Sequence, residues 1–180
     1  MAKRILVLGA SSSKKSINKQ FASYAAAQIK GADLNLLDLN DFEMPIYSID
    51  REKEDGIPAL AQQFKEHIRT ADGIIISFAE HNGAYSAAYK NIYDWVSRIE
   101  KGVWLDKPML LLATSPGGRG GIGVLDLAFS SYSYANKNHV GRFSLPSFGQ
   151  NFSPEGGILD RDLKTEFHEQ LLQFTQAVTK

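Results

Sequence analysis

The sequence contains no cysteine, which excludes disulfides, thiolate metal sites and a cysteine nucleophile. It also lacks an excess of either charge, because Lys plus Arg and Asp plus Glu each number 20. A nucleic-acid-binding protein normally carries a basic excess, so this balance argues against one. No apolar run approaches the roughly 18 residues that are needed to cross a bilayer, and no membrane partner is expected.

The N-terminus places basic residues before a short apolar run and thereby resembles a signal peptide. The run ends after a few residues in a Ser/Lys-rich stretch, so residues 4–9 are interpreted as a first strand and a cytoplasmic location is expected. With 180 residues, 43% hydrophobic and 22% charged, the chain has the size and composition of one globular domain covering residues 1–180.

Short apolar runs alternate with segments of helical period along the whole chain. Strands are predicted at residues 4–9, 33–39, 73–79, 108–114 and 139–145, and helices at 17–30, 58–71, 85–100, 124–136 and 163–178. Gly102 is expected to cap the third helix, and a loop is expected around Pro45. Since at least three strands are wholly apolar, the pattern predicts a parallel, doubly wound sheet with helices on both faces.

Ligands of such sheets bind outside the carboxyl ends of the strands, where the strand order reverses. This rule selects three loops of unusual composition, at residues 10–16, 80–84 and 115–123. We expect these three loops to lie together.

The first loop, GASSSKKSIN, supplies four serine hydroxyls and two lysines at the start of a helix. Backbone N–H groups and the helix dipole favour an anion there, and hydroxyls suit a phosphate monoester. The alternative is that Ser16 merely caps the helix. Neither the Walker pattern nor the dinucleotide pattern G-x-G-x-x-G is present, so neither an ATP site nor a Rossmann site is indicated.

The third loop, TSPGGRGGIG, contains five glycines, which let a backbone approach a ligand closely. A flexible surface loop is an equally good interpretation of the glycines alone. Arg119 is either a phosphate ligand or a solvated side chain.

With these loops in view, the chain resembles the NADPH-dependent FMN reductase family. That family reads G-S-x-R-x-x-S-x-N after its first strand, where residues 10–18 of this chain read ASSSKKSIN. After the third strand the family reads P-E-Y-N, followed by K-N-x-I/L-D-W, where this chain has AEHN and KNIYDW in register. The resemblance covers residues 3 to 150 and implies a flavodoxin-like three-layer fold with strand order 2-1-3-4-5.

The chain departs from the family pattern at three positions. Ser13 stands in place of the family arginine, and Lys14 or Lys15 would then supply the missing cation. Ala79 replaces the proline and His81 replaces the tyrosine, which changes the surroundings of the flavin ring.

The resemblance implies a division of labour among the loops. The first loop and the following helix would hold the FMN phosphate, residues 80–83 would contact the isoalloxazine mostly through main-chain groups, and residues 115–118 would close the other side of the ring. The implied FMN-binding residues are Ser11, Ser13, Ser16, Ile17, Asn18, Glu80, His81, Asn82, Gly83, Ser115, Gly117 and Gly118.

The function implied is an FMN-dependent oxidoreductase that passes hydride from NADPH or NADH to quinones, azo compounds, metal oxyanions or free flavin. Both substrates would use one flavin face in turn, which gives ping-pong kinetics. No side chain is expected to perform acid–base catalysis. His81 either packs against or hydrogen-bonds to the flavin ring or is a proton donor to the reduced acceptor. The alternatives are a flavodoxin-type electron carrier and a hydrolase of phosphorylated substrates, which has no Ser-His-Asp order or metal set to support it.

Other polar and aromatic residues have simpler interpretations. Lys90 and Asp94 are spaced for an ion pair on a helix surface. Trp95 and the tyrosines of the same helix indicate a core or a helix–helix contact, and the resemblance implies a homodimer or homotetramer. His67, His139 and His168 have no metal-ligand spacing, so they are interpreted as surface residues and no metal site is expected.

Overall fold

The computed structural model describes residues 2–180. Its main sheet has five strands in the order β2-β1-β3-β6-β7, and all its pairs are parallel. This is the predicted order 2-1-3-4-5, and the flavodoxin-like fold is confirmed. In chain order the elements are β1 (Arg4–Ala10), α1 (Ile17–Ala27), β2 (Asp33–Leu37), η1 (Leu39–Phe42), α2 (Ile49–Asp55), α3 (Ala59–Thr70), β3 (Gly73–Phe78), β4 (Glu80–His81), β5 (Ala84–Tyr85), α4 (Ala87–Val96), β6 (Met109–Thr114), α5 (Ile122–Ala135), β7 (Val140–Leu145), α6 (Phe148–Asn151), β8 (Phe152–Ser153), β9 (Gly157–Ile158) and α7 (Arg161–Thr179).

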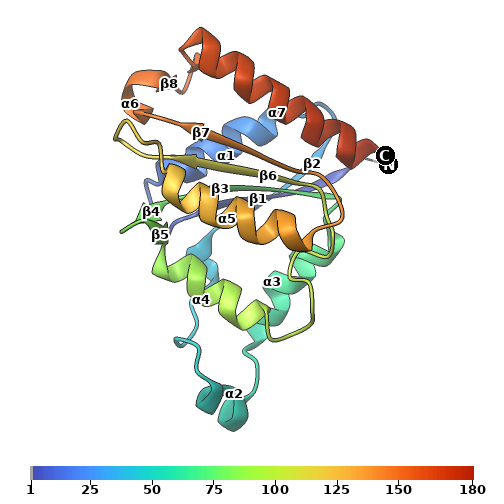
Figure 1. Cartoon of the computed structure of the whole chain (residues 1–180). Coiled ribbons are helices and arrows are strands. Elements are labelled where there is room, and N and C mark those ends of the chain that lie inside the picture. The colour runs from blue at the N-terminus through green and yellow to red at the C-terminus, as the bar shows by residue number, and fades with distance from the viewer. Residues whose placement is uncertain (1) are drawn as a thin grey trace.

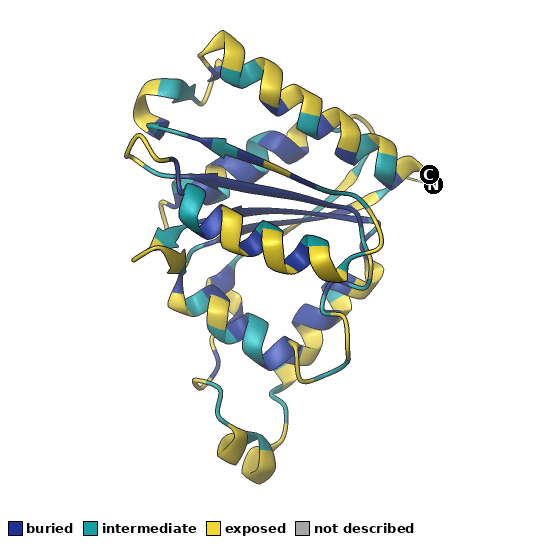
Figure 2. Cartoon of the chain, in the orientation of Figure 1, coloured by how far each residue is buried: buried dark blue, intermediate teal, exposed yellow. Residues whose placement is uncertain are grey.

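Helices cover both faces of the sheet and leave the central strands buried (Figure 1 and Figure 2). Alternate strand residues point to opposite faces, so β1 directs Leu6 and Leu8 into one core and Ile5 and Val7 into the other. The first core packs against α3, α4 and α5, and the second against α1 and α7. Two cores explain why the central strands read as unbroken apolar runs.

A close approach of α1 to the sheet is set by Gly9. A Cβ at this position would lie 2.5 Å from Lys19 Cα, which is backbone and has no room to move aside. Glycine therefore lets the first turn of α1 sit directly beside the end of β1.

The observed boundaries correct several predictions around the third helix. The helix begins at Ala87 rather than residue 85, because residues 84–85 pair with residues 80–81 in a small hairpin and Ser86 is the N-cap. It ends at Val96, and Ser97 forms its C-cap, so the prediction that Gly102 caps this helix was wrong. Gly102 instead adopts a left-handed turn (φ 74°) in the following loop.

The segment between β2 and α3 also differs from the expected loop. The strand ends at Leu37, and Leu39 opens the short helix η1. Residues 49–55 form α2, which projects from the body of the protein (Figure 1). Its sequence, IDREKED, has no buried residue, so the apolar periodicity that would have revealed it is missing.

Candidate functional site

The three loops selected from the sequence converge at the carboxyl edge of the sheet. They line a cleft of about 300 Å³ between the start of α1 and the loops that follow β3 and β6. The cleft residues are Ser11, Ser13, Lys15, Ser16, Ile17, Asn18, Ala79, Glu80, His81, Thr114, Ser115 and Pro116. Eight of the predicted FMN-binding residues are in this set, whereas Asn82, Gly83, Gly117 and Gly118 lie outside it.

The first loop is folded by its own hydroxyls and forms a helix N-terminus that faces the cleft. Ser11 Oγ accepts from the Ser13 amide at 3.2 Å, and Ser16 Oγ accepts from the Lys19 amide, also at 3.2 Å. Ser16 is therefore the N-cap of α1, as the helix-cap interpretation expected. The amides of Ile17 and Asn18, in the first turn, have no intrahelical carbonyl to bind and are suited to an anion.

Charge beside this helix end comes from lysines. Lys15 lines the cleft and is exposed. Lys19 is directed instead to Asp38, and this hydrogen bond holds the pKa of the Asp38 carboxyl below its ordinary value. Of these two lysines, Lys15 is therefore the one placed to balance the charge of an anion in the cleft.

Asn18 connects the bases of two of the loops. Its side chain is 3% exposed, its Nδ2 donates to Thr114 O at 3.1 Å, and its Oδ1 accepts from Ser77 Oγ at 2.7 Å and from the Thr114 amide at 3.0 Å. The amide group therefore fixes α1 to β3 and β6. Most of its hydrogen-bonding capacity is used within the protein, so its role toward a phosphate stays a prediction.

The stretch after β3 forms a tight hairpin. Asn82 (φ 53°) and Gly83 (φ 76°) are consecutive left-handed residues, the combination that a two-residue hairpin turn requires. Ser86 secures the base of the hairpin, because its Oγ donates to Ala10 O at 2.9 Å and accepts from the Tyr89 amide at 3.3 Å. The imidazole of His81 is exposed at the cleft.

Glu80 joins this hairpin to the third loop. Its carboxylate accepts from the Val124 amide at 3.0 Å, in the first turn of α5. A Cβ at Gly123 would lie 3.0 Å from the same carboxylate, so glycine leaves the space that the side chain occupies. The glutamate is consequently engaged by a helix N-terminus, and it is the backbone of the hairpin that remains for a ligand.

The glycine-rich loop is ordered by contacts with β7 and the segment after it. The Ser147 amide donates to Gly117 O and the Phe148 amide to Ser115 O, both at 3.0 Å. Ser144 Oγ donates to Gly120 O at 3.0 Å. The loop is therefore held at both ends, while Gly118 has open space around its Cα.

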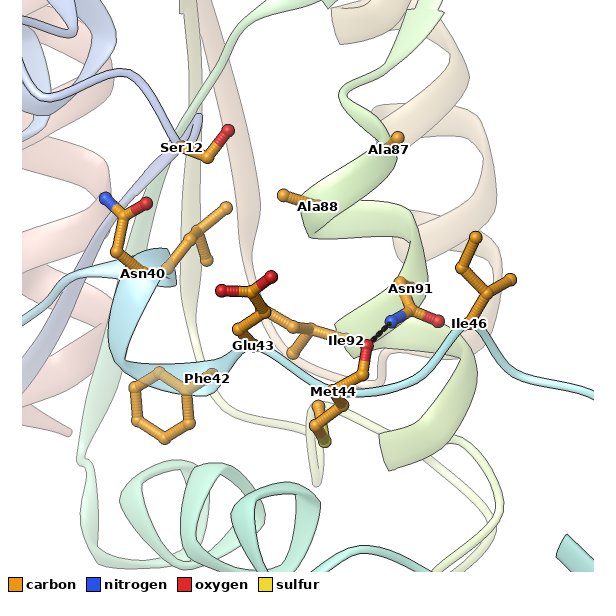
Figure 3. A pocket seen from close by; sticks show the side chains of 11 residues that line it. Ser12, Asn40, Phe42, Glu43, Met44, Ile46, Ala87, Ala88, Asn91 and Ile92 are labelled. Atoms are coloured by element: carbon orange, nitrogen blue, oxygen red, sulfur yellow. Dashed lines mark hydrogen bonds between the residues drawn. The ribbon is translucent and has the colours of Figure 1, made fainter. Parts of the chain in front are cut away.

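A second hollow, of about 420 Å³, lies beside the first loop (Figure 3). Ser12 marks one end, and its sides come from α4 and from the segment that begins at η1. Asn91 holds that segment in place, because its Nδ2 donates to Met44 O at 3.0 Å. The sequence did not indicate this hollow, because its lining residues are ordinary apolar and polar types that only the fold brings together.

Several other residues that the sequence analysis discussed lie away from the cleft. Lys90 Nζ and Asp94 Oδ1 are 2.7 Å apart, which confirms the predicted helix-surface ion pair. His67 is half-buried and shares a hydrogen bond with Asn35, and His139 has a buried Nε2, so the surface interpretation was wrong for these two histidines. Burial lowers the pKa of His139 below its ordinary value.

Of the lining residues, Thr114, Pro116 and Ala79 were not among the predicted FMN ligands. Thr114 and Pro116 flank Ser115 in the sequence, so adjacency to a predicted residue was the available signal. Lys15 was considered only as a replacement for the missing arginine.

A cleft at the carboxyl edge of a parallel sheet in this order, with serine, asparagine and lysine residues in its lining, defines an α/β protein of flavodoxin-like class. The model of the family described as NADPH-dependent FMN reductase matches residues 3–150, and the chain belongs to this family. It is thus an FMN-dependent NAD(P)H oxidoreductase by class, which confirms the family, enzyme type and cofactors inferred from the motifs.

Individual relatives agree with this assignment. An NADPH:quinone oxidoreductase of Arabidopsis thaliana is 31% identical over 157 residues, covering 84% of this chain and 76% of the relative. An NADPH azoreductase of Bacillus sp. (strain OY1-2) is 32% identical over 74% of this chain and 71% of the relative. Some other curated relatives are matched over only 42% to 64% of their own length.

Solved structures support the fold. The flavoenzyme NAD(P)H:(acceptor) oxidoreductase FerB of Paracoccus denitrificans superposes with a TM-score of 0.76 over 99% of this chain and 98% of that chain, at 20% identity. Among the helices of residues 2–180, none combines the length and the apolarity that crossing a bilayer requires.

Proposed function

We propose that residues 1–180 form one FMN-binding domain that transfers a hydride from NADPH or NADH to a small-molecule acceptor. The observation that carries the proposal is the convergence of the three loops on one cleft, where hydroxyls, a helix N-terminus and Lys15 face each other. This donor set fits a phosphate monoester beside a polar ring edge, which is the chemistry that FMN presents.

The phosphate end of the cofactor would lie at the start of α1. Ser11, Ser13 and Ser16 would supply hydroxyls there, and the backbone amides of Ile17 and Asn18 would supply N–H donors. Because Ser13 stands where the family has arginine, Lys15 would supply the positive charge instead. Neutral donors orient the phosphate, and the helix dipole and the lysine balance its charge.

The ring end would lie between the hairpin of residues 80–85 and Ser115. Since the Glu80 carboxylate is bound to α5, main-chain groups of residues 80–83 are the ones proposed to meet the polar edge of the ring. Gly117 and Gly118 would let the third loop approach the opposite side. When bound, FMN supplies the hydride chemistry, and the chain supplies position and electrostatics.

The proposed acceptors are quinones and azo compounds, with metal oxyanions and free flavin as further members of the same class. Support comes from the relatives named as quinone oxidoreductase and azoreductase. His81, exposed at the cleft, is proposed to donate a proton to the acceptor as it is reduced. The donor and the acceptor would occupy the same side of the cleft in turn.

The test is an absorbance experiment on the pure protein with FMN added. Bound FMN should shift its visible bands, and NADPH should bleach them in the absence of any protein partner. A further addition of 1,4-benzoquinone should restore the bands, and initial rates should give the parallel lines of ping-pong kinetics. Unchanged flavin bands would disprove FMN binding, and bleaching only with a partner reductase would identify an electron carrier.

We also propose a cytoplasmic homodimer or homotetramer. The segment between η1 and α3 projects from the sheet, and its Ile46 (75% exposed) and Ile49 (46% exposed) are apolar residues left at the surface. Asn91 and Trp95 of α4 hold this segment, so α4 and the projection would form one contact surface. A sedimentation mass equal to one chain would contradict the oligomer, and NAD(P)H as co-substrate favours the cytoplasm.

A further inference from the structure

The tip of the hairpin formed by β4 and β5 consists of Asn82 and Gly83, the one asparagine–glycine pair in the sequence. Both residues are exposed, and neither is among the residues that line the FMN cleft. Asparagine is a thermolabile residue, and it reacts fastest before glycine, because the next residue then has no side chain to hinder its backbone nitrogen. By its sequence context, Asn82 is therefore the most reactive asparagine of the chain.

The reaction open to this pair is an intramolecular ring closure. The backbone nitrogen of Gly83 attacks Cγ of Asn82, a new N–C bond forms, the Cγ–Nδ2 bond breaks, and ammonia leaves with the proton of the Gly83 amide. Water then opens the resulting succinimide at either of its two carbonyl carbons, which gives aspartate or isoaspartate. One water is consumed and one ammonia is released, so the reaction transfers no electrons and needs no co-reactant other than water.

The attacking nitrogen is unhindered in the described part of the chain. A Cβ at Gly83 would meet no atom within 4 Å, and the Gly83 amide donates to no acceptor outside the hairpin among residues 2–180. The two Asp–Gly pairs of the sequence can form the same succinimide, but their glycines are held firmly. The Gly56 amide donates to Glu52 O at 3.0 Å, and Gly73 is buried in β3 against Val178.

The observed turn sets one of the two backbone angles of Asn82 for this reaction. The five atoms of the succinimide ring must be coplanar, which in an L-residue requires a ψ of about −120°. Such a ψ combined with the observed φ of 53° is the conformation of the first central residue of a type II′ turn. The left-handed region instead pairs this φ with a ψ of roughly +30 to +60°, which places the Gly83 nitrogen on the far side of the Cα–C bond from Cγ. Only ψ therefore has to change.

A rotation of the peptide plane between Asn82 and Gly83 supplies that change. Type I′ and type II′ turns differ by this rotation, and both close two-residue hairpins, so the flanking strands stay paired. The rotation reverses the sign of φ at the second central residue, and glycine populates both signs about equally. Gly83 therefore leaves its nitrogen accessible and also permits the rotation that precedes the attack.

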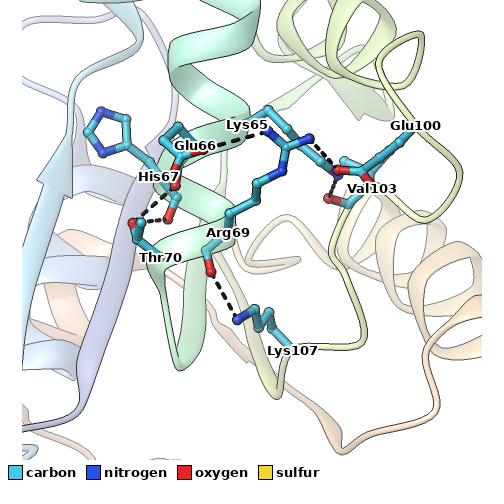
Figure 4. Close-up of polar contacts among 8 residues, drawn as sticks. All are labelled: Lys65, Glu66, His67, Arg69, Thr70, Glu100, Val103 and Lys107. Carbon is cyan, nitrogen blue, oxygen red and sulfur yellow. Dashed lines mark hydrogen bonds and ion pairs between the residues drawn. The ribbon is translucent and has the colours of Figure 1, made fainter.

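The peptide group at the tip has no partner that would prevent this rotation. The left-handed turn at Gly102 shows the contrast, because the buried ammonium of Lys65 donates to Gly102 O at 3.2 Å and to Val103 O at 2.7 Å (Figure 4). Among residues 2–180, no group forms a hydrogen bond of this kind with the Gly83 amide or the Asn82 carbonyl. The tip is therefore free to change between the two turn types.

The proposed function gives this peptide group a partner from outside the chain. Main-chain groups of residues 80–83 would meet the polar edge of the flavin ring, and FMN bound in this way would fix the peptide plane and prevent the rotation. Both products carry a carboxylate at position 82, and isoaspartate adds a methylene to the backbone, which disrupts the two-residue turn. The modified hairpin would hold the ring less well than the original one.

We propose that Asn82–Gly83 is a self-modification site, at which the protein without cofactor converts Asn82 into aspartate and isoaspartate, and that bound FMN protects it. The conversion is independent of the oxidoreductase activity, whereas the protection rests on the proposed function. Protein that spends time without FMN thereby loses affinity for it.

The experiment incubates the full-length protein at mildly alkaline pH with and without saturating FMN. Mass spectrometry of the tryptic peptide of residues 70–90 follows the change from amide to acid, and fragmentation assigns it to position 82. The acid form should accumulate in the protein without FMN and at least about fivefold more slowly with it. Asn138, which is exposed but precedes His139, is the internal control and should remain unchanged.

No conversion at position 82 in the protein without FMN would overturn the proposal. Equal rates with and without FMN, when its visible bands show that it is bound, would overturn the protection. Flavin that does not bind would overturn the proposed function and the protection together, while the conversion in the free protein is measured independently of either.

Three variants test the chemistry and its consequence. Asn82→Gly removes the reacting amide and keeps a pair of residues suited to the turn, so the conversion should disappear. Asn82→Asp reproduces one product and should weaken FMN binding at least about threefold through its added charge, whereas Asn138→Asp, at the opposite end of the sheet, should not. Equal FMN affinities for the two aspartate variants would contradict the loss of affinity on modification.

Discussion

At the scale of the residue, Asn18 shows how one buried amide positions a site. The family resemblance assigns it to the FMN phosphate, but the three hydrogen bonds of its side chain go to Ser77 and Thr114. A side chain that connects α1 to β3 and β6 determines where the first and third loops stand relative to each other. Its contribution to the cofactor is therefore expected to be mainly indirect.

We predict that Asn18→Ala destabilises the protein by about 2–4 kcal/mol, because the Ser77 hydroxyl and both backbone groups of Thr114 lose their buried partner. Urea unfolding followed by circular dichroism measures the loss. Ser12→Ala, at an exposed position of the same loop, is the control and should change stability by less than about 0.5 kcal/mol. Equal stabilities for the two variants would contradict the role given to Asn18.

A second residue-scale prediction concerns the lysines of the first loop. Lys15 lines the cleft whereas Lys14 does not, although both are exposed and adjacent. Lys15→Gln should weaken FMN binding about five- to tenfold, and Lys14→Gln less than twofold, in titrations that follow quenching of FMN fluorescence. The difference should shrink at 0.5 M salt, since screening reduces the contribution of an exposed charge. A larger effect at Lys14 would assign the cation to the other lysine.

At the scale of the element, the hairpin of β4 and β5 and helix α5 act as one unit. The hairpin contains only two paired residues on each side, and such a short ribbon is not stable by itself. Glu80 fastens it to the N-terminus of α5, and Ser86 fastens it to the end of β1. The conformation proposed to support the flavin ring therefore depends on neighbours far away in the sequence.

We predict that Glu80→Ala lowers stability by about 1–2 kcal/mol, because α5 loses an acceptor and a favourable charge at its N-terminus. FMN should also bind more weakly as the hairpin loosens. Glu80→Gln keeps an acceptor oxygen and should lose about half as much. Thermal unfolding with and without FMN measures both effects, and a variant as stable as the parent protein would show that the hydrogen bond to Val124 contributes nothing.

At the scale of the whole molecule, two apolar cores on the faces of the sheet hold the fold, and ion pairs connect its outer elements. Glu52 pairs with Arg98 between α2 and the end of α4, and Glu100 pairs with Arg69 of α3. These arginines lower the pKa values of Glu52 and Glu100 below the ordinary value of 4.5. The carboxylates therefore favour the folded state only while they remain charged.

The pH dependence of stability follows from the sign of these shifts. In the folded state the pKa values are lower than in the unfolded chain, so the unfolded chain binds protons first as the pH falls. The stabilisation that the charged Glu52 and Glu100 carboxylates give to the folded state should be complete above about pH 4.5. It should be lost as the pH falls through their pKa values in the folded state. The thermal midpoint, measured by circular dichroism from pH 7 to pH 3, should therefore decrease once the pH is below about 4.5.

Glu52→Gln tests the origin of this slope. The variant should have a lower thermal midpoint at pH 7 than the parent protein and a shallower decline between pH 5 and pH 3. A parent protein whose midpoint is constant or rises over that range would contradict the assignment of the shifts.

Several features followed from local sequence alone. The unbroken apolar runs of β1, β3 and β6 predicted strands that are buried on both faces, and the serine-rich loop predicted a helix N-terminus at Ser16. Helix α2 was not predicted, because a helix without a buried face has no apolar periodicity. The predicted end of α4 was too late in the chain. Glycine is typical of a helix C-cap, but Gly102 lies in the loop that follows the helix.

The sequence by itself determined the fold class, the strand order through its family motifs and the three loops that line the proposed FMN cleft, because each depends on residues that are near one another in the chain. Only the tertiary structure decided which atoms face the cleft. The Glu80 carboxylate binds α5, and Asn18 binds β3 and β6. These arrangements join residues that are distant in the sequence, and they arise when packing across the sheet fixes the positions of the helices.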